Sequence, residues 1–164
     1  MIAIENVTRD DLPLLAPIYV EAYNALKIGE TWTDSTAMKL LTNFFDSQAD
    51  LFFVAKSDGE IVGAIVAIVK PWCDGNRLTD GEFFVKPGMQ GKGIGTLLIR
   101  HMFQKAYEKY QAISWDTFTH RIHEYPLNWY KKIGFEEIKE WVMITGDVKK
   151  VLSVIGNAKN DRKE

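Results

Sequence analysis

A glycine-rich segment in the middle of the chain constrains the fold more than any other stretch. The strand-like run 82–85 leads into a loop with Gly91, Gly93 and Gly95 at alternate positions, and an apolar run with helical spacing begins at Leu97. Glycines let backbone N–H groups come close to a ligand. The first N–H groups of a helix have no internal partner and lie at the positive end of its dipole. The sequence therefore predicts an anion site, best suited to phosphate, between a strand and a helix.

Two common phosphate-binding patterns do not match this loop. The dinucleotide pattern GxGxxG fails because Thr96 stands where its third glycine is required. The P-loop pattern GxxxxGK[ST] fits the spacing of Gly88 and Gly93, but Ile94 stands in place of the lysine. The pattern that remains is Gln-x-x-Gly-x-Gly over residues 90–95.

This remaining pattern resembles the Q/R-x-x-G-x-G/A loop of the GNAT family of acyl-coenzyme A-dependent N-acyltransferases. A second stretch, Trp-Tyr-Lys-Lys-Ile-Gly-Phe over residues 129–135, resembles the second signature of that family, an aromatic residue or leucine followed by Tyr-x-x-x-Gly-Phe. Two motifs in the right order, with a strand-like run between them, are more specific than a lone glycine loop. The alternative is a glycine-rich turn that only packs a helix against a sheet.

Hydrophobic patterning predicts a mixed α/β (α+β) fold with a partly antiparallel sheet and the element order β-α-α-β-β-β-α-β-α-β. The GNAT fold implied by the resemblance has the same order, with helices on both faces of the sheet. In that fold the parallel strands expected at 78–85 and 112–119 splay apart and hold the pantetheine arm between them. A central strand over 61–69 is expected to end at Pro71, and a last long strand is expected over 135–144.

The composition is typical of a soluble globular protein. At 164 residues the chain can bury about two thirds of its unfolded surface, and we expect one N-acyltransferase domain over residues 1–155 with a mobile polar tail over 156–164. The net charge of −2 gives no indication of nucleic-acid or anionic-membrane binding, and no run approaches the roughly 18 apolar residues of a membrane span. No signal peptide is visible. A cytoplasmic enzyme, monomeric or homodimeric, is therefore expected.

Transfer of an acyl group to an amine makes three chemical demands. The amine must lose a proton, because an alkylammonium group with a pKa of about 10 is not a nucleophile at neutral pH. The oxyanion that forms needs hydrogen-bond donors, and the departing thiolate benefits from a proton. A metal ion is not expected, because no cysteine or paired carboxylate stands at ligand spacing beside the histidines.

Glu82 is the candidate base. Strand alternation places it on the same face as Phe84, near the end of the strand where the thioester is expected. Asp80 is expected on the same face two residues earlier and is the alternative base, and water alone could also accept the proton. Glu82 could instead be a solvated or salt-bridged strand residue, because structural ion pairs perturb carboxylates too.

Tyr130 is the candidate acid, because a phenol with a pKa of about 10 is protonated at neutral pH. The resemblance implies that this tyrosine lies beside the sulfur of coenzyme A and that the backbone N–H of Val85 is the oxyanion donor. The alternative is that Tyr130 is an amphipathic core residue on a short helix.

The resemblance also implies the cosubstrate, acetyl-coenzyme A. Its pyrophosphate would be held by the backbone of the glycine loop, with the positive charge of Lys92 beside it. The chain departs from the family at His123, where an asparagine that touches pantetheine is common. The expected cofactor-binding residues are Phe84, Val85, Gln90, Gly91, Lys92, Gly93, Ile94, Gly95, Thr96 and Tyr130.

Aromatic and acidic residues near the predicted strand ends and in the loop before the second helix indicate the acceptor. Carboxylates attract ammonium groups and tryptophan rings bind cations, so a small cationic amine is expected. The candidate acceptor-binding residues are Trp32, Trp72, Asp80 and Asp116. These tryptophans could equally pack the core while the acids face water. Two other functions stay open: N-acetylation of a peptide or protein, and non-catalytic sensing of acyl-coenzyme A.

Overall fold

The computed structural model describes residues 1–121 and 124–158. By contacts between residues the chain divides into two compact units, Met1–Ile122 and His123–Glu164. Within the described residues, no helix is both long enough and apolar enough to cross a membrane.

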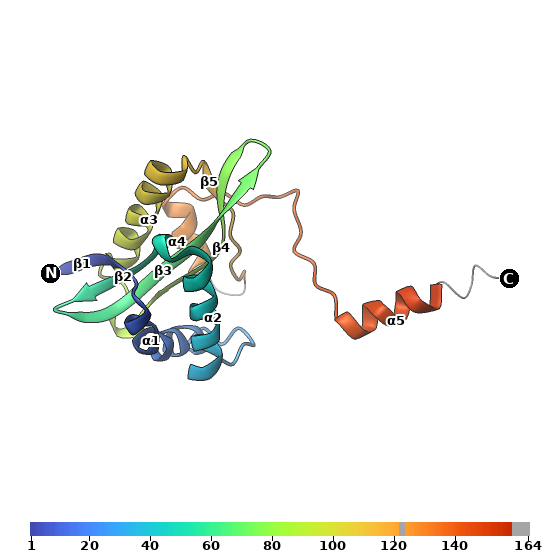
Figure 1. Cartoon of the computed structure of the whole chain (residues 1–164), viewed down its shortest axis with the longest axis horizontal. Helices are drawn as coiled ribbons and strands as arrows, with labels where there is room; N and C mark the ends of the chain where they lie inside the picture. The colour runs from blue at the N-terminus through green and yellow to red at the C-terminus, as the bar shows by residue number, and fades with distance from the viewer. Residues whose placement is uncertain (122–123, 159–164) are drawn as a thin grey trace. The chain divides into compact units, whose positions relative to one another are not determined.

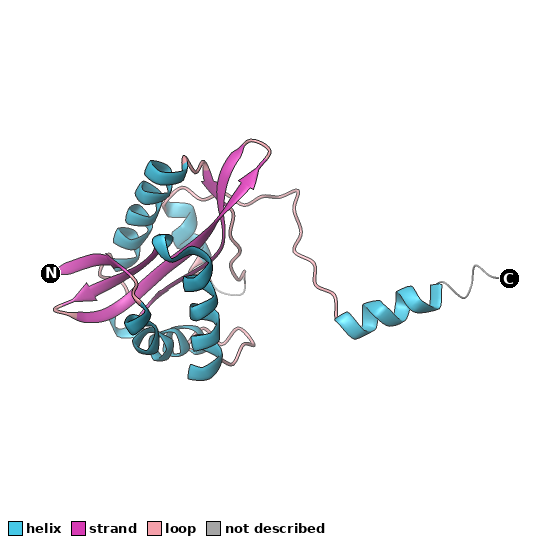
Figure 2. Cartoon of the chain, viewed as in Figure 1, coloured by secondary structure: helices cyan, strands magenta, loops and turns pink. Residues whose placement is uncertain are grey.

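The first unit is built on one mixed sheet of five strands in the order β1-β2-β3-β4-β5 (Figures 1 and 2). The strands are β1 (Ile2–Asn6), β2 (Phe52–Ser57), β3 (Glu60–Trp72), β4 (Gly75–Val85) and β5 (Ser114–Trp115). The first four strands pair antiparallel, and β4 pairs parallel with β5. The helices are α1 (Leu12–Asn24), α2 (Asp34–Gln48) and α3 (Ile94–Tyr110), with short 3-10 turns η1 (Arg9–Asp11), η2 (Ala49–Leu51) and η3 (Pro87–Met89).

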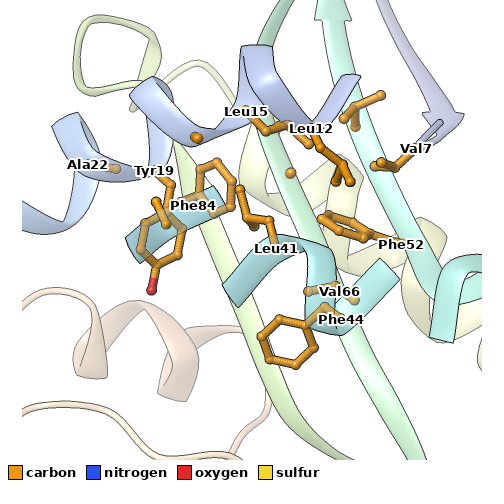
Figure 3. Close-up of a cluster of buried hydrophobic side chains, with 14 residues drawn as sticks. Val7, Leu12, Leu15, Tyr19, Ala22, Leu41, Phe44, Phe52, Val66 and Phe84 are labelled. Atoms are coloured by element: carbon orange, nitrogen blue, oxygen red, sulfur yellow. The ribbon is translucent and has the colours of Figure 1, made fainter. Parts of the chain in front are cut away.

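Helices cover both faces of this sheet, as expected from the resemblance. Alternate strand residues such as Phe52, Val66 and Phe84 pack in one buried cluster with side chains of α1 and α2 (Figure 3). Phe53 points to the other face, where its ring meets His101 of α3 at 4.6 Å between centroids. Because both faces are covered, β2 and β3 read as nearly continuous apolar runs rather than as an alternating pattern.

The β3–β4 hairpin is longer than the sequence predicts. β3 continues through Pro71 to Trp72, where it pairs with Gly75 of β4, so the expectation that Pro71 ends the strand is wrong. The pairing of β2 with β3 reaches only Val66, and the rest of β3 therefore has a strand partner on one side alone. A proline is tolerated there because its missing N–H can lie on the unpaired side.

The parallel pairing of β4 with β5 is confirmed, but it is shorter than expected. It joins Arg77 to Ser114 and Leu78 to Trp115, whereas β4 continues to Val85. The expected strand over 112–119 is therefore reduced to two residues. The two strands separate after Leu78, which is the splayed arrangement that the resemblance implies.

In the second unit the structure describes two helices, α4 (Leu127–Lys132) and α5 (Val148–Ala158). The expected last strand over 135–144 is absent from the described residues, so the predicted element order is wrong at its end. Helix α5 includes residues 156–158 of the expected tail, and residues 159–164 lie outside the described part of the chain. The single domain over residues 1–155 stays a prediction.

Candidate functional site

The glycine loop lies between β4 and α3, where the sequence predicts it. Gly91 and Gly93 have φ values of 74° and 80°, in the left-handed region that glycine adopts without a steric penalty. A Cβ atom at either position would meet no atom within 4 Å. Both glycines are therefore required by the backbone conformation and not by packing, and the backbone lies open on that side.

Helix α3 begins with its N–H groups uncapped by a side chain. Gly93 is the N-cap residue, and its carbonyl accepts the N–H of Leu97 at 3.1 Å. The N–H groups of Ile94, Gly95 and Thr96 precede the first residue that can bond back to a carbonyl of the same helix. Together with the helix dipole, they form a positive site that suits phosphate oxygens.

Side chains of the loop support this backbone. The amide of Gln90 donates to the carbonyl of Val85 at 3.1 Å and so ties the loop to the end of β4. Ile94 is buried in the core, so only its backbone can contact a ligand. Lys92 is exposed, with its Nζ 3.3 Å from the sulfur of Met89, and it adds a positive charge to the loop.

Strand pairing directs the N–H of Val85 away from β3. Lys86 donates its N–H to the carbonyl of Val62 at 2.8 Å, so these two residues form a hydrogen-bonded pair. Hydrogen-bonded and non-hydrogen-bonded pairs alternate along an antiparallel ladder, and Val85 pairs with Gly63. The N–H of Val85 therefore points to the other edge of β4, the edge that β5 has left at Leu78. An oxyanion donor must point to a place that a ligand can reach, and the N–H of Val85 meets this requirement.

A β-bulge at Asp80 and Gly81 interrupts the pairing of β3 with β4. Thr79 pairs with Ile68 and Glu82 with the residue two positions earlier in β3, so two residues of β4 oppose one of β3. Asp80 is exposed and has a φ of 44°. Simple alternation does not hold across this bulge, so it does not support the expectation that Asp80 shares a face with Glu82.

The ring of Trp115 explains the glycine in the bulge. A Cβ atom on Gly81 would lie 2.5 Å from Cζ2 of Trp115 and 2.6 Å from the carbonyl oxygen of Val66. Trp115 is buried and also meets Phe103 of α3 at 6.1 Å between ring centroids. The tryptophan thus packs over the bulge just beyond the last β4–β5 pair, where the strands part.

Glu82 lies beside an aromatic cluster formed by α1 and β4. The hydroxyl of Tyr23 donates to Oε2 of Glu82. The Tyr23 ring stacks on Tyr19, with centroids 4.2 Å apart and planes 22° apart. Tyr19 is almost fully buried, and its ring meets Phe84 edge to face at 5.2 Å (Figure 3). Two tyrosines one helical turn apart thus hold the carboxylate at the rim of the core.

Burial raises the pKa of Glu82, and the negative charge of Glu30 acts in the same direction. The hydroxyls of Tyr23 and Tyr19 oppose this rise, because they donate to the ionised carboxylate. Burial also raises the pKa of Tyr19, which therefore stays protonated. A general base works best when its pKa lies near the working pH, so these surroundings suit Glu82 to accept a proton.

The loop between α1 and α2 brings Trp32 and Glu30 to the same cluster. The side chain of Asn24 donates to the carbonyl of Trp32 at 3.0 Å and accepts its N–H at 2.9 Å. The Trp32 ring meets Tyr19 edge to face at 5.0 Å, and its indole N–H donates to Glu30 at 2.8 Å. Of the four candidate acceptor-binding residues, Trp32 is the one that shares a cluster with Glu82.

Trp72 and Asp116 belong to a different cluster at the turn of the β3–β4 hairpin. Lys70 Nζ and Arg77 Cζ lie 4.7 Å and 5.9 Å from the centroid of the Trp72 ring, and Arg77 donates to Asp116 at 2.9 Å. Trp72 follows the β3 partner of Glu82 by six positions, which corresponds to roughly 20 Å along a strand. The structure does not bring these two residues together with Glu82.

Tyr130 lies in the second unit, at the end of α4. Gly134 has a φ of 102° and donates its N–H to Lys131, and Phe135 donates its N–H to the carbonyl of Tyr130 at 3.0 Å. This pair of bonds is a Schellman motif, and the rings of Tyr130 and Phe135 make its usual apolar contact at 5.0 Å. The Tyr-x-x-x-Gly-Phe signature therefore has a local structural role that fixes the backbone of Tyr130. His123 lies outside the described residues.

Sequence reasoning missed three residues of the Glu82 cluster: Tyr19, Tyr23 and Asn24. The spacing of the two tyrosines, four positions apart on a predicted helix, was the available signal, but it also fits ordinary packing. Nothing local to Asn24 indicates its bonds to Trp32, which is eight positions away. Among residues 1–121 and 124–158, no group of three His, Cys, Asp or Glu side chains is placed to hold a metal ion.

The family model of the Acetyltransferase (GNAT) family matches residues 15–135. The matched range includes the glycine loop, Glu82 and the whole of the Tyr130 signature. The chain belongs to the GNAT acetyltransferase family.

Curated relatives carry acetyltransferase names. An uncharacterized N-acetyltransferase of Methanocaldococcus jannaschii is 28% identical over 158 residues, which cover 85% of this chain and 64% of the relative. The streptothricin acetyltransferase of Streptomyces lavendulae is 30% identical over 90 residues, covering 55% of this chain and 46% of the relative. The chain thus spans between about half and two thirds of the length of these two relatives.

Solved structures share the fold. A predicted acetyltransferase of Clostridium acetobutylicum, crystallised with acetyl-coenzyme A, superposes with a TM-score of 0.66 at 17% identity. The match covers 88% of this chain and 96% of that chain. At this identity the likeness shows the fold alone.

Proposed function

We propose that this protein transfers the acetyl group of acetyl-coenzyme A to the primary amine of a small cationic acceptor, by direct transfer in a ternary complex. The observation that carries the proposal is the Glu82 cluster. It joins a half-buried carboxylate of raised pKa, Glu82, to a second carboxylate, Glu30, and to the ring of Trp32. Carboxylates and tryptophan rings both attract ammonium groups. Family membership supplies the reaction class.

The glycine loop fits the cosubstrate. Its left-handed glycines and the uncapped start of α3 offer backbone donors to a pyrophosphate, and Lys92 adds a positive charge. Acetyl-coenzyme A, when bound, supplies the activated thioester. The residues that we propose hold it are Phe84, Val85, Gln90, Gly91, Lys92, Gly93, Ile94, Gly95, Thr96 and Tyr130. Of these, Phe84, Val85 and Ile94 contribute backbone atoms, because their side chains are buried.

The chain's own groups have three tasks in this reaction. Glu82 accepts a proton from the acceptor ammonium, directly or through water, and Asp80 or water alone are the alternatives. The N–H of Val85 donates to the carbonyl oxygen as negative charge develops there. Tyr130 protonates the departing thiolate, and the Schellman motif at Gly134 keeps its backbone in one conformation for that task.

The acceptor is proposed to bind between Trp32, Glu30 and Glu82. We assign Trp72 and Asp116 to the hairpin cluster, where Arg77 forms ion pairs with Asp116 and Asp74 and the cations of Lys70 and Arg77 lie over the Trp72 ring. The name of the Streptomyces lavendulae relative supports a small-molecule acceptor over a protein. We further propose a cytoplasmic location, with no nucleic-acid or membrane partner and a monomeric or homodimeric state.

Release of free thiol from acetyl-coenzyme A tests this function. The acceptor panel should hold a polyamine, an aminoglycoside, streptothricin, a neutral primary amine and a short peptide with a free N-terminus. We expect thiol release with at least one small cationic amine and much slower release with the neutral amine. Release with the peptide alone would favour protein N-acetylation. Binding of acetyl-coenzyme A without release by any amine would favour a sensor domain.

A further inference from the structure

We propose that Tyr23 is the positioning residue for Glu82 and sets the pH range in which Glu82 accepts a proton. The inference rests on the proposed function of Glu82 as the base. Tyr23 lies on α1, and its hydroxyl donates to Oε2 of the Glu82 carboxylate on β4, 59 positions away in the chain. This bond therefore links α1 to β4 at the proposed site.

The aromatic cluster holds Tyr23 in the orientation that makes this bond. Its ring stacks on Tyr19 at 4.2 Å, and Tyr19 is in turn fixed edge to face by Phe84 at 5.2 Å and Trp32 at 5.0 Å. Phe84 follows Glu82 by two positions on the same strand and shares its face, because no bulge lies between them. The donor and the acceptor are thus both anchored to one packed cluster.

Four groups with titratable protons meet at this point. They are Glu82 on β4, Tyr19 and Tyr23 on α1, and Glu30 in the loop before α2. Glu30 disfavours a second negative charge on Glu82, whereas the two hydroxyls favour it by donating hydrogen bonds. Without the Tyr23 hydroxyl, burial and Glu30 would raise the pKa of Glu82 further. Glu82 would then stay protonated over a wider pH range, and the protonated carboxyl cannot act as a base.

The test compares the wild type with Tyr23→Phe, which keeps the stacked ring and removes only the hydroxyl. One arm follows the carboxyl carbon of Glu82 by NMR against pH, with the signal assigned from its loss in Glu82→Gln. The other arm measures kcat/KM against pH by thiol release. Tyr107→Phe is the matched control, because Tyr107 is an exposed tyrosine on α3.

In Tyr23→Phe we expect the titration of Glu82 and the acid limb of kcat/KM to move together to higher pH by about one unit, the size expected when a charged group loses one hydrogen bond. At a pH below the limb this is about a tenfold loss of kcat/KM, with a smaller loss on the plateau. Tyr107→Phe should change neither curve. Because Tyr23 acts through Glu82, adding Tyr23→Phe to Glu82→Gln should cost no further activity.

An unchanged titration of Glu82 in folded Tyr23→Phe would overturn the inference, whether or not the wild type transfers acetyl groups. A double variant that is clearly slower than Glu82→Gln would also overturn it, because Tyr23 would then act independently of Glu82. A wild type that releases no thiol with any amine would overturn the proposed function alone, since the NMR arm still decides how Tyr23 acts on Glu82.

Discussion

Among the single residues, Glu82 has the environment that most alters its chemistry, because its surroundings raise the pKa of its carboxyl group. Its carboxylate is half-buried next to Tyr19 and Tyr23, and Glu30 adds a nearby negative charge. The folded pKa of Glu82 is therefore raised above the unfolded value of about 4.3, so folding favours the protonated form. The contribution of Glu82 to the free energy of unfolding is complete at pH values below its unfolded pKa. It is lost as the pH rises through its folded pKa.

Glu82→Gln should remove this titration from the folded state. We expect its free energy of unfolding to fall less than that of the wild type as pH rises from about 4 to about 8, since the introduced amide keeps a carbonyl for Tyr23 and carries no charge. Urea unfolding at a series of pH values measures the difference. If the free energy of unfolding depends on pH equally in the two proteins, the pKa of Glu82 is not raised in the folded state.

Glu30→Gln should act on Glu82 in the direction opposite to Tyr23→Phe. Removing the negative charge lowers the pKa of Glu82, so the acid limb of kcat/KM should move to lower pH. The KM for a cationic acceptor should rise because an attracting carboxylate is lost, while the KM for acetyl-coenzyme A stays unchanged. Steady-state kinetics over a pH series measure both effects, and an unchanged KM for the acceptor would remove Glu30 from its binding site.

Tyr130→Phe should lower turnover more than cosubstrate affinity. Loss of a general acid costs about 10²- to 10⁴-fold in rate, and the ring that contacts Phe135 is retained. Thiol release under saturating substrates, together with a titration of acetyl-coenzyme A, separates the two effects. If turnover is the same as in the wild type, the tyrosine serves the Schellman motif and takes no part in the chemistry.

At the scale of secondary-structure elements, the junction of β4 with α3 makes a prediction about its glycines. Alanine at Gly93 must adopt a left-handed conformation, which costs about 1–2 kcal/mol, although its Cβ meets no atom within 4 Å. We expect Gly93→Ala to lower the free energy of unfolding by about that amount and to weaken acetyl-coenzyme A binding. Gly88→Ala is the control, because Gly88 has no left-handed φ and equally open surroundings. Equal effects of the two variants on cosubstrate affinity would contradict this assignment.

The elements also separate what can be predicted from sequence from what cannot. The glycine loop and the Tyr130 signature are predictable, because each depends on a backbone conformation encoded within a few residues, at Gly93 and at Gly134. The need for glycine at position 81 in the bulge is not, since it depends on the ring of Trp115, which is 34 positions later in the sequence. The same holds for the bond from Tyr23 to Glu82.

The lengths of the strands are poorly predicted from sequence for a related reason. Periodicity indicates which side chains a segment can bury, but a strand also needs a partner edge. β3 extends past Pro71 because β4 pairs with it to the turn, and β5 has only two residues because its pairing with β4 ends at Leu78. The segment 135–144 is expected to form a strand, yet it forms none in the described structure.

For the whole molecule, the family match runs from residue 15 to residue 135 and so crosses from the first compact unit into the second. The first unit contains the glycine loop, Val85 and Glu82, and the second contains Tyr130. Under the proposed function, residues of both units contribute to acetyl transfer, and each unit's contribution is tested by its own variant, Gly93→Ala in the first and Tyr130→Phe in the second.

Binding of acetyl-coenzyme A to the wild-type chain tests this account most directly. A calorimetric titration should give one site per chain, and thermal unfolding should show stabilisation of about 2.7 kcal/mol at a ligand concentration 100 times the Kd. Gly93→Ala should bind more weakly than Gly88→Ala in the same titration. A wild type that is neither bound nor stabilised by acetyl-coenzyme A would contradict the assignment of the loop and, with it, the proposed acetyl transfer.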